Sequence, residues 1–67
     1  MKYKIEIWQY YNIVETYESD NIEYVLSWYR ANWWLTYENG GCAFSVYMNN
    51  EELSFEEKID LGFIDFD

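Results

Sequence analysis

The chain contains no histidine and no proline, a single cysteine, and only four lysine or arginine residues among its 67 residues. Without histidine, one chain cannot assemble a Ser-His or Cys-His pair or a histidine metal site. The lone Cys42 cannot form an internal disulfide, and no cationic segment followed by an apolar run predicts secretion or membrane insertion. These absences favour a protein of the bacterial cytoplasm that is not an enzyme.

Motifs that hold a phosphate group or a metal ion are missing as well. None of the three glycines precedes a Lys-Ser or Lys-Thr pair, so the chain has no phosphate-binding loop. Asp60, Asp65 and Asp67 lack the Asp-x-Asp-x-Asp-Gly spacing and the distal glutamate of a calcium loop. Adjacent acids such as Glu56 and Glu57 are typical of a solvated face or of a helix start. We therefore expect no cofactor and no metal site.

Acidic and aromatic residues dominate what is present. Thirteen carboxylates against four cations give a formal net charge of −9, and 24% of the residues are aromatic. This charge opposes binding to nucleic acid or to an anionic membrane, and it favours a basic protein as partner. With 51% hydrophobic residues, the chain is too apolar to be a disordered acidic tail. Its length predicts one domain, residues 1–67.

The N-terminal residues have the pattern of a β-hairpin. Residues 2–8 alternate between two faces, and residues 13–18 are rich in β-branched and aromatic side chains. The loop between them leaves the register open. A two-residue loop places Val14 and Thr16 on the face of the isoleucines of the first strand. A loop one residue longer brings the alternate set to that face: Ile13, Glu15 and Tyr17.

A helix is predicted from about residue 21. Asp20 and Glu23 have the spacing of an N-cap and the acidic residue of a capping box. Large apolar residues then recur at helical spacing and form one stripe, with Arg30 off it. Tyr24 and Trp28 flank the stripe, where they either cover the edge of the sheet or face a partner, and we favour the first. The stripe consists of Ile22, Val25, Leu26, Tyr29 and Trp33.

The second half of the chain predicts a three-stranded meander. Residues 34–38 and 42–48 flank an Asn-Gly dipeptide at 39–40, which suits a two-residue type I′ turn. The Asn-Asn dipeptide at 49–50 supplies a second tight turn into a third strand. In the hairpin around residues 39–40, a two-residue loop keeps one face uniformly apolar, whereas a three-residue loop does not.

The two turns assign the residues of the meander to opposite faces. They set Val46 opposite Leu53 and Phe44 opposite Phe55. We expect the helix to pack on the inner face, which contains Trp33, Leu35, Tyr37, Cys42, Phe44, Val46, Leu53 and Phe55. The outer face contains Trp34, Thr36, Glu38, Ala43, Ser45, Tyr47, Glu52 and Ser54.

The C-terminal residues predict a short helical turn. Ser54 and Glu57 have capping-box spacing, and Gly62 stops the apolar run that includes Ile59. Residues 63–67 either pair as an edge strand or trail as an acidic tail. The predicted fold class is α+β: a small antiparallel sheet made of the N-terminal hairpin and the meander, with one helix packed on one face and a short C-terminal helical turn.

The acidic residues are concentrated late in the chain. Seven carboxylates and one lysine lie between residues 51 and 67. In size, acidity and aromatic content the chain resembles, in general type, small early proteins with which phages and mobile elements inhibit host restriction, CRISPR or DNA-repair enzymes by mimicking DNA. The resemblance implies an inhibitor that occupies a basic nucleic-acid-binding surface. The candidate partner-binding residues are Trp34, Glu38, Tyr47, Glu51, Glu52, Glu56, Glu57 and Asp60.

A second hypothesis is a self-associating or scaffold-like interaction protein. In this case Trp8, Trp34 and Tyr47 form a homotypic aromatic interface, and the acids serve solubility. The sequence leaves open whether the chain is a monomer or a homodimer. Salt distinguishes the two hypotheses, because a complex led by charge weakens as ionic strength rises, whereas an aromatic interface is indifferent or tightened.

Overall fold

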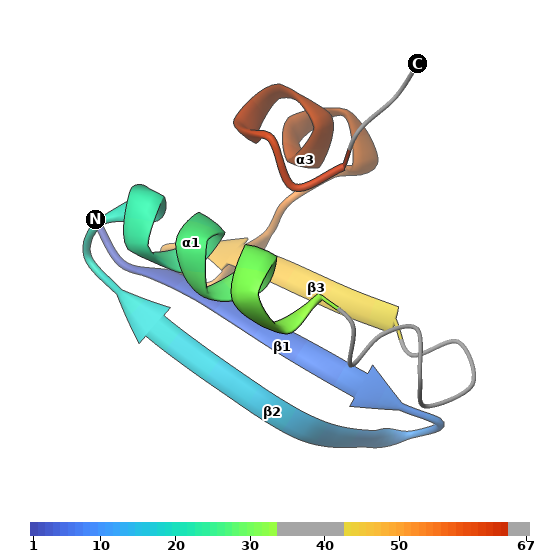
Figure 1. Cartoon of the computed structure of the whole chain (residues 1–67). Coiled ribbons are helices and arrows are strands. Elements are labelled where there is room, and N and C mark those ends of the chain that lie inside the picture. The colour runs from blue at the N-terminus through green and yellow to red at the C-terminus, as the bar shows by residue number, and fades with distance from the viewer. Residues whose placement is uncertain (34–42, 65–67) are drawn as a thin grey trace.

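The computed structural model describes residues 1–33 and 43–64, which form a four-stranded antiparallel sheet with two helices (Figure 1). The strand order is β2-β1-β3-β4, so β1 joins the N-terminal hairpin to the strands of the C-terminal half. The α+β class is therefore confirmed. The elements are β1 (Tyr3–Gln9), β2 (Asn12–Ser19), α1 (Ile22–Asn32), β3 (Ala43–Met48), β4 (Glu51–Glu52) and α3 (Phe55–Leu61).

The N-terminal hairpin combines the two registers that the sequence leaves open. Gln9 pairs with Asn12, so the turn has two residues, but the register then shifts and Ile7 pairs with Glu15. Val14 is the extra residue of this β-bulge. Beyond the bulge, β2 follows the alternate set of residues, which neither simple register predicts on its own.

Helix α1 begins one residue later than the sequence suggests. The N-cap is Asn21 and not Asp20, because the Asn21 backbone is extended and its Oδ1 accepts a hydrogen bond from the Glu23 N–H at 2.9 Å. The Asn21 N–H in turn donates to Ser19 Oγ at 3.1 Å. With this start, Val25 faces the sheet and is fully buried.

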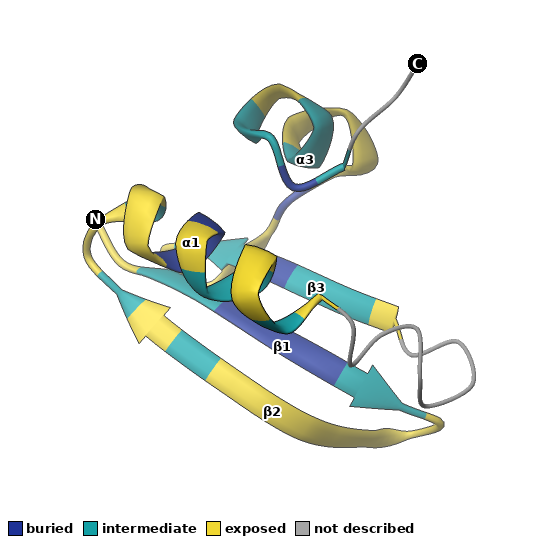
Figure 2. Cartoon of the chain, viewed as in Figure 1, coloured by how far each residue is buried: buried dark blue, intermediate teal, exposed yellow. Residues whose placement is uncertain are grey.

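Helix α1 lies on one face of the sheet (Figure 2), and four residues of its predicted stripe belong to the core or pack against it: Ile22, Val25, Leu26 and Tyr29. Trp28 covers the edge of the sheet, since its ring stacks on Tyr17 of β2 at 5.5 Å between centroids. Tyr24 does not cover the edge and is 61% exposed, and Trp33 at the end of the stripe is 50% exposed. The buried core contains Ile5, Val25, Leu26, Val46, Leu53 and Phe63.

The turn at 49–50 has the predicted conformation, with φ of 53° at Asn49 and 69° at Asn50. The Leu53 N–H donates to the Val46 carbonyl at 2.7 Å, which confirms that pair. The predicted pair of Phe44 with Phe55 is wrong, because the chain leaves the sheet after Leu53 and Phe55 opens α3. The predicted strand 34–38, the turn at 39–40, Cys42 and residues 65–67 lie outside the described residues.

The predicted capping box at the start of α3 is confirmed. The Glu57 N–H donates to Ser54 Oγ at 3.2 Å, and the Ser54 N–H donates to Glu57 Oε1 at 3.0 Å. Gly62 ends the helix in the left-handed conformation with φ of 95°, and the next residue, Phe63, turns back into the core. Phe63 is thus neither part of an edge strand nor of a tail. Of the helices within residues 1–33 and 43–64, none has the length and hydropathy that crossing a bilayer requires.

Candidate partner-binding surfaces

Five of the predicted partner-binding acids are exposed on β4 and α3, and this set of residues is here called the acidic surface. The two elements adjoin in the chain, with the turn at 49–50 before β4 and the capping box starting α3. All five side chains are exposed. The acidic surface consists of Glu51, Glu52, Glu56, Glu57 and Asp60.

The charge of the acidic surface is not neutralised by the cations of the described residues. The ion pairs in this part of the chain are Lys2–Glu18 at 3.5 Å and Lys4–Glu6 at 3.4 Å, both in the hairpin. Lys58 is the nearest cation in sequence, but its Nζ lies over the Phe44 ring, 5.1 Å from the centroid. The negative potential of β4 and α3 therefore extends into solvent.

The carboxylate of Glu57 stays charged to lower pH than an ordinary glutamate. The backbone N–H and the hydroxyl of Ser54 both hydrogen-bond with it, and they hold the pKa of Glu57 below its usual value. Glu57 therefore both fixes the start of α3 and contributes a negative charge to the acidic surface at neutral pH.

Tyr47 lies on the outer face of the sheet, opposite Glu52 on β4, so the structure brings these two predicted residues together. Its surroundings are of mixed charge, because Lys4 Nζ lies 5.1 Å from the centre of its ring and Glu6 accepts from its hydroxyl. Burial, and then the charge and hydrogen bond of Glu6, raise the pKa of Tyr47. Trp34 and Glu38, the other predicted residues of this face, lie outside the described residues.

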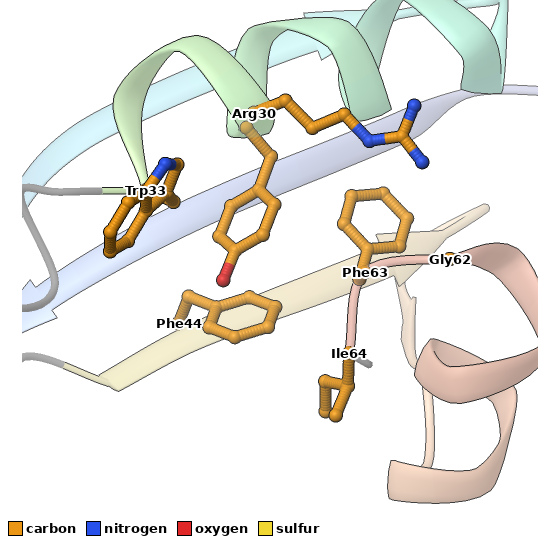
Figure 3. A pocket seen from close by; sticks show the side chains of 7 residues that line it. Arg30, Trp33, Phe44, Gly62, Phe63 and Ile64 are labelled. Atoms are coloured by element: carbon orange, nitrogen blue, oxygen red, sulfur yellow. The ribbon is translucent and has the colours of Figure 1, made fainter. Parts of the chain in front are cut away.

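Sequence reasoning missed an aromatic cleft between α1, β3 and the segment after α3 (Figure 3). Its volume is about 560 Å³. The Tyr29 ring lies against Phe44 at 4.7 Å and Phe63 at 5.7 Å between centroids. A hydrophobic residue directly after a C-cap glycine was the available signal. The lining residues are Tyr29, Arg30, Trp33, Phe44, Gly62, Phe63 and Ile64.

The two surfaces offer different kinds of contact. Nowhere in residues 1–33 and 43–64 do three or more Cys, Asp or Glu side chains gather so that they could hold a metal ion. The cleft offers apolar rings and one guanidinium, which suit contact with a side chain of a partner. The acidic surface offers carboxylates in water, which suit a basic partner.

Comparison of the chain with protein-family models, with curated proteins and with solved structures finds no match in any of the three.

Proposed function

We propose that the protein is an acidic protein-binding module of the bacterial cytoplasm, an inhibitor that occupies a basic nucleic-acid-binding surface of a host or phage enzyme. The observation that carries the proposal is the acidic surface: five exposed carboxylates on β4 and α3 that no cation of the described residues pairs with. Such a surface attracts clusters of lysine and arginine and repels nucleic acid.

The density of carboxylates on α3 is close to the density of phosphates along duplex DNA. Glu56, Glu57 and Asp60 lie within five residues of helix, and the four steps between the first and the last make about 6 Å of axis at about 1.5 Å per residue. Duplex DNA presents one negative charge per about 1.7 Å of axis, so between three and four charges fall within about 6 Å. A protein site spaced for phosphates thus meets a comparable number of carboxylates.

Buried residues at both ends of α3 support the acidic surface. Leu53, before the helix, and Phe63, after it, are each 4% exposed and belong to the core. A helix fixed at both ends presents its charges with little entropy left to lose on binding, which favours affinity. This support distinguishes the surface from an acidic tail.

Charge reversal tests the proposal without disturbing the capping box. Glu52 and Glu56 are both replaced by lysine, a change of four charge units on exposed positions. The matched control places the same change at Asp20 and Glu23, which are exposed at the start of α1. Tagged proteins are used to capture partners from a bacterial lysate at low and at high salt, and circular dichroism checks the fold.

We expect the parent and the Asp20/Glu23 control to retain the same basic protein at low salt and to release it at high salt. The Glu52/Glu56 variant is expected to lose that protein, because like charges across an interface cost several kcal/mol. Equal capture by both variants would refute a role for the acidic surface. Capture of the chain by itself, unchanged or stronger at high salt, would favour the self-associating alternative.

A further inference from the structure

Strand β2 forms an open edge of the sheet. Within residues 1–33 and 43–64 its only partner strand is β1, and it is eight residues long, whereas β4 near the opposite edge has two. Most of its side chains are exposed, as Figure 2 shows along the ribbon of β2. A long edge strand presents unpaired backbone groups with which another extended chain can pair.

The register identifies which backbone groups of β2 point outward. The Asn49 N–H donates to the carbonyl of Lys2, directly before β1, at 2.8 Å. The even-numbered residues of β1 therefore direct their backbone groups toward β3. The odd-numbered residues of β1 then direct their backbone groups toward β2, and Thr16 Oγ1 accordingly donates to the Ile5 carbonyl at 3.2 Å. Because these groups alternate along an antiparallel strand, the N–H and C=O groups of Thr16 and Glu18 point away from the sheet.

The charge along this edge is negative. Glu15 and Glu18 are exposed on β2, and β2 contains no lysine or arginine. The ion pair with Lys2 offsets the charge of Glu18 but not that of Glu15. A second copy of the chain, itself at −9, would bring glutamates against glutamates, and like charges that face each other across strands are destabilising. The edge therefore favours a basic strand over a copy of itself.

A hollow beside β2 can receive a side chain of an added strand. It has a volume of about 550 Å³, and its walls combine the carboxylates of Glu6 and Glu18 with the apolar side chain of Ile13. Glu6 is paired with Lys4 at 3.4 Å, whereas the side chain of Glu18, which is paired with Lys2 at 3.5 Å, stays 49% exposed. A lysine or arginine can place its alkyl stem on Ile13 and its charged end near the exposed side of Glu18. The remaining lining residues are Lys4, Thr16 and Tyr17.

We propose that β2 binds an extended segment of a basic protein by strand addition, with backbone hydrogen bonds to Thr16 and Glu18 and with lysine or arginine side chains over the hollow. This mode takes its affinity from the backbone and its specificity from alternate side chains. This binding mode uses a surface other than the acidic surface on β4 and α3, so its test is independent of the test of the proposed function.

The test uses a synthetic peptide of about eight residues with alternating lysine and valine, and the same peptide with N-methyl groups on all of its backbone amides. The peptides have equal charge, but the methylated one cannot donate to β2. We expect the first to protect the amides of Thr16 and Glu18 from hydrogen exchange, and the methylated peptide to bind at least about tenfold more weakly. Equal binding of the two peptides, or no protection of these amides, would overturn the proposal.

Substitution at Glu18 gives a second, independent measurement. Glu18→Ala removes the carboxylate and keeps the N–H, whereas Glu18→Pro also removes the outward N–H, which has no partner in β1. We expect Glu18→Pro to lose at least about ten times more peptide affinity than Glu18→Ala. If Glu18→Pro does not fold, the exchange measurement on the parent decides. A dimer that already protects these amides without peptide would contradict the proposal, and the Glu52/Glu56 variant should still bind the peptide.

Discussion

Phe63 is the residue whose removal should most directly detach the acidic surface from the sheet. It is 4% exposed, belongs to the core, and its ring lies 5.7 Å from that of Tyr29 on α1. Truncation of a buried phenylalanine to alanine costs about 3–5 kcal/mol. At about 0.05–0.15 kcal/mol per residue, a chain of 67 residues has a free energy of unfolding of about 3–10 kcal/mol. Phe63→Ala should therefore remove a large share of the stability.

Urea unfolding followed by tryptophan fluorescence measures this loss. The matched control is Phe55→Ala at the other end of α3, where the side chain is 51% exposed, and we expect it to cost clearly less. A second readout is hydrogen exchange at the amides of α3, which should accelerate in Phe63→Ala before global unfolding. If Phe63→Ala and the parent unfold at the same urea concentration, Phe63 does not hold α3 on the core and the packing described above is wrong.

Three further predictions concern single positions. Phe44→Ala should cost about 3 kcal/mol, since its ring packs on Tyr29 at 4.7 Å, and an unchanged melting temperature would remove Phe44 from the inner face. Because the fold lowers the pKa of Glu57 from its ordinary value of 4.5, its contribution to stability is present above that pH and is lost as pH falls through the folded pKa. Ser54→Ala should reduce this loss of stability at acid pH, measured as the melting temperature at stepped pH. An unchanged pH dependence would exclude the cap. Asn50, at φ of 69°, should tolerate glycine but lose about 1 kcal/mol on replacement by alanine, measured by urea unfolding, and equal stability of the two variants would contradict the turn.

The parts of the fold that the sequence predicts are those decided by neighbouring residues. The Ser54–Glu57 capping box depends on a spacing of three residues, and the turn at 49–50 depends on two asparagines that tolerate positive φ. The buried positions of α1 follow from helical spacing in the same way. In these segments local chemistry and tertiary packing agree.

The parts that the sequence does not predict depend on contacts between distant elements. Where β2 resumes pairing after the bulge, Tyr17 stacks on Trp28, a contact that no local pattern contains. The pairing of β1 with β3 places Lys4 over Tyr47, and this gives the outer face a mixed charge where the sequence suggested acids alone. The exposure of the acids on β4 and α3 was predictable because charged side chains stay in water. The aromatic cleft was not, because Phe63 reaches the core only after α3 is placed.

The most direct measurement of the proposed function is competition with duplex DNA. The partner captured from bacterial lysate is held on the immobilised parent protein at low salt, and increasing amounts of a short duplex are added. If the acidic surface occupies a nucleic-acid site, the duplex should release the partner completely, and an uncharged polymer should not. Retention of the partner at saturating duplex, with the duplex bound to the same complex, would show that the acidic surface lies elsewhere on the partner and would contradict the account.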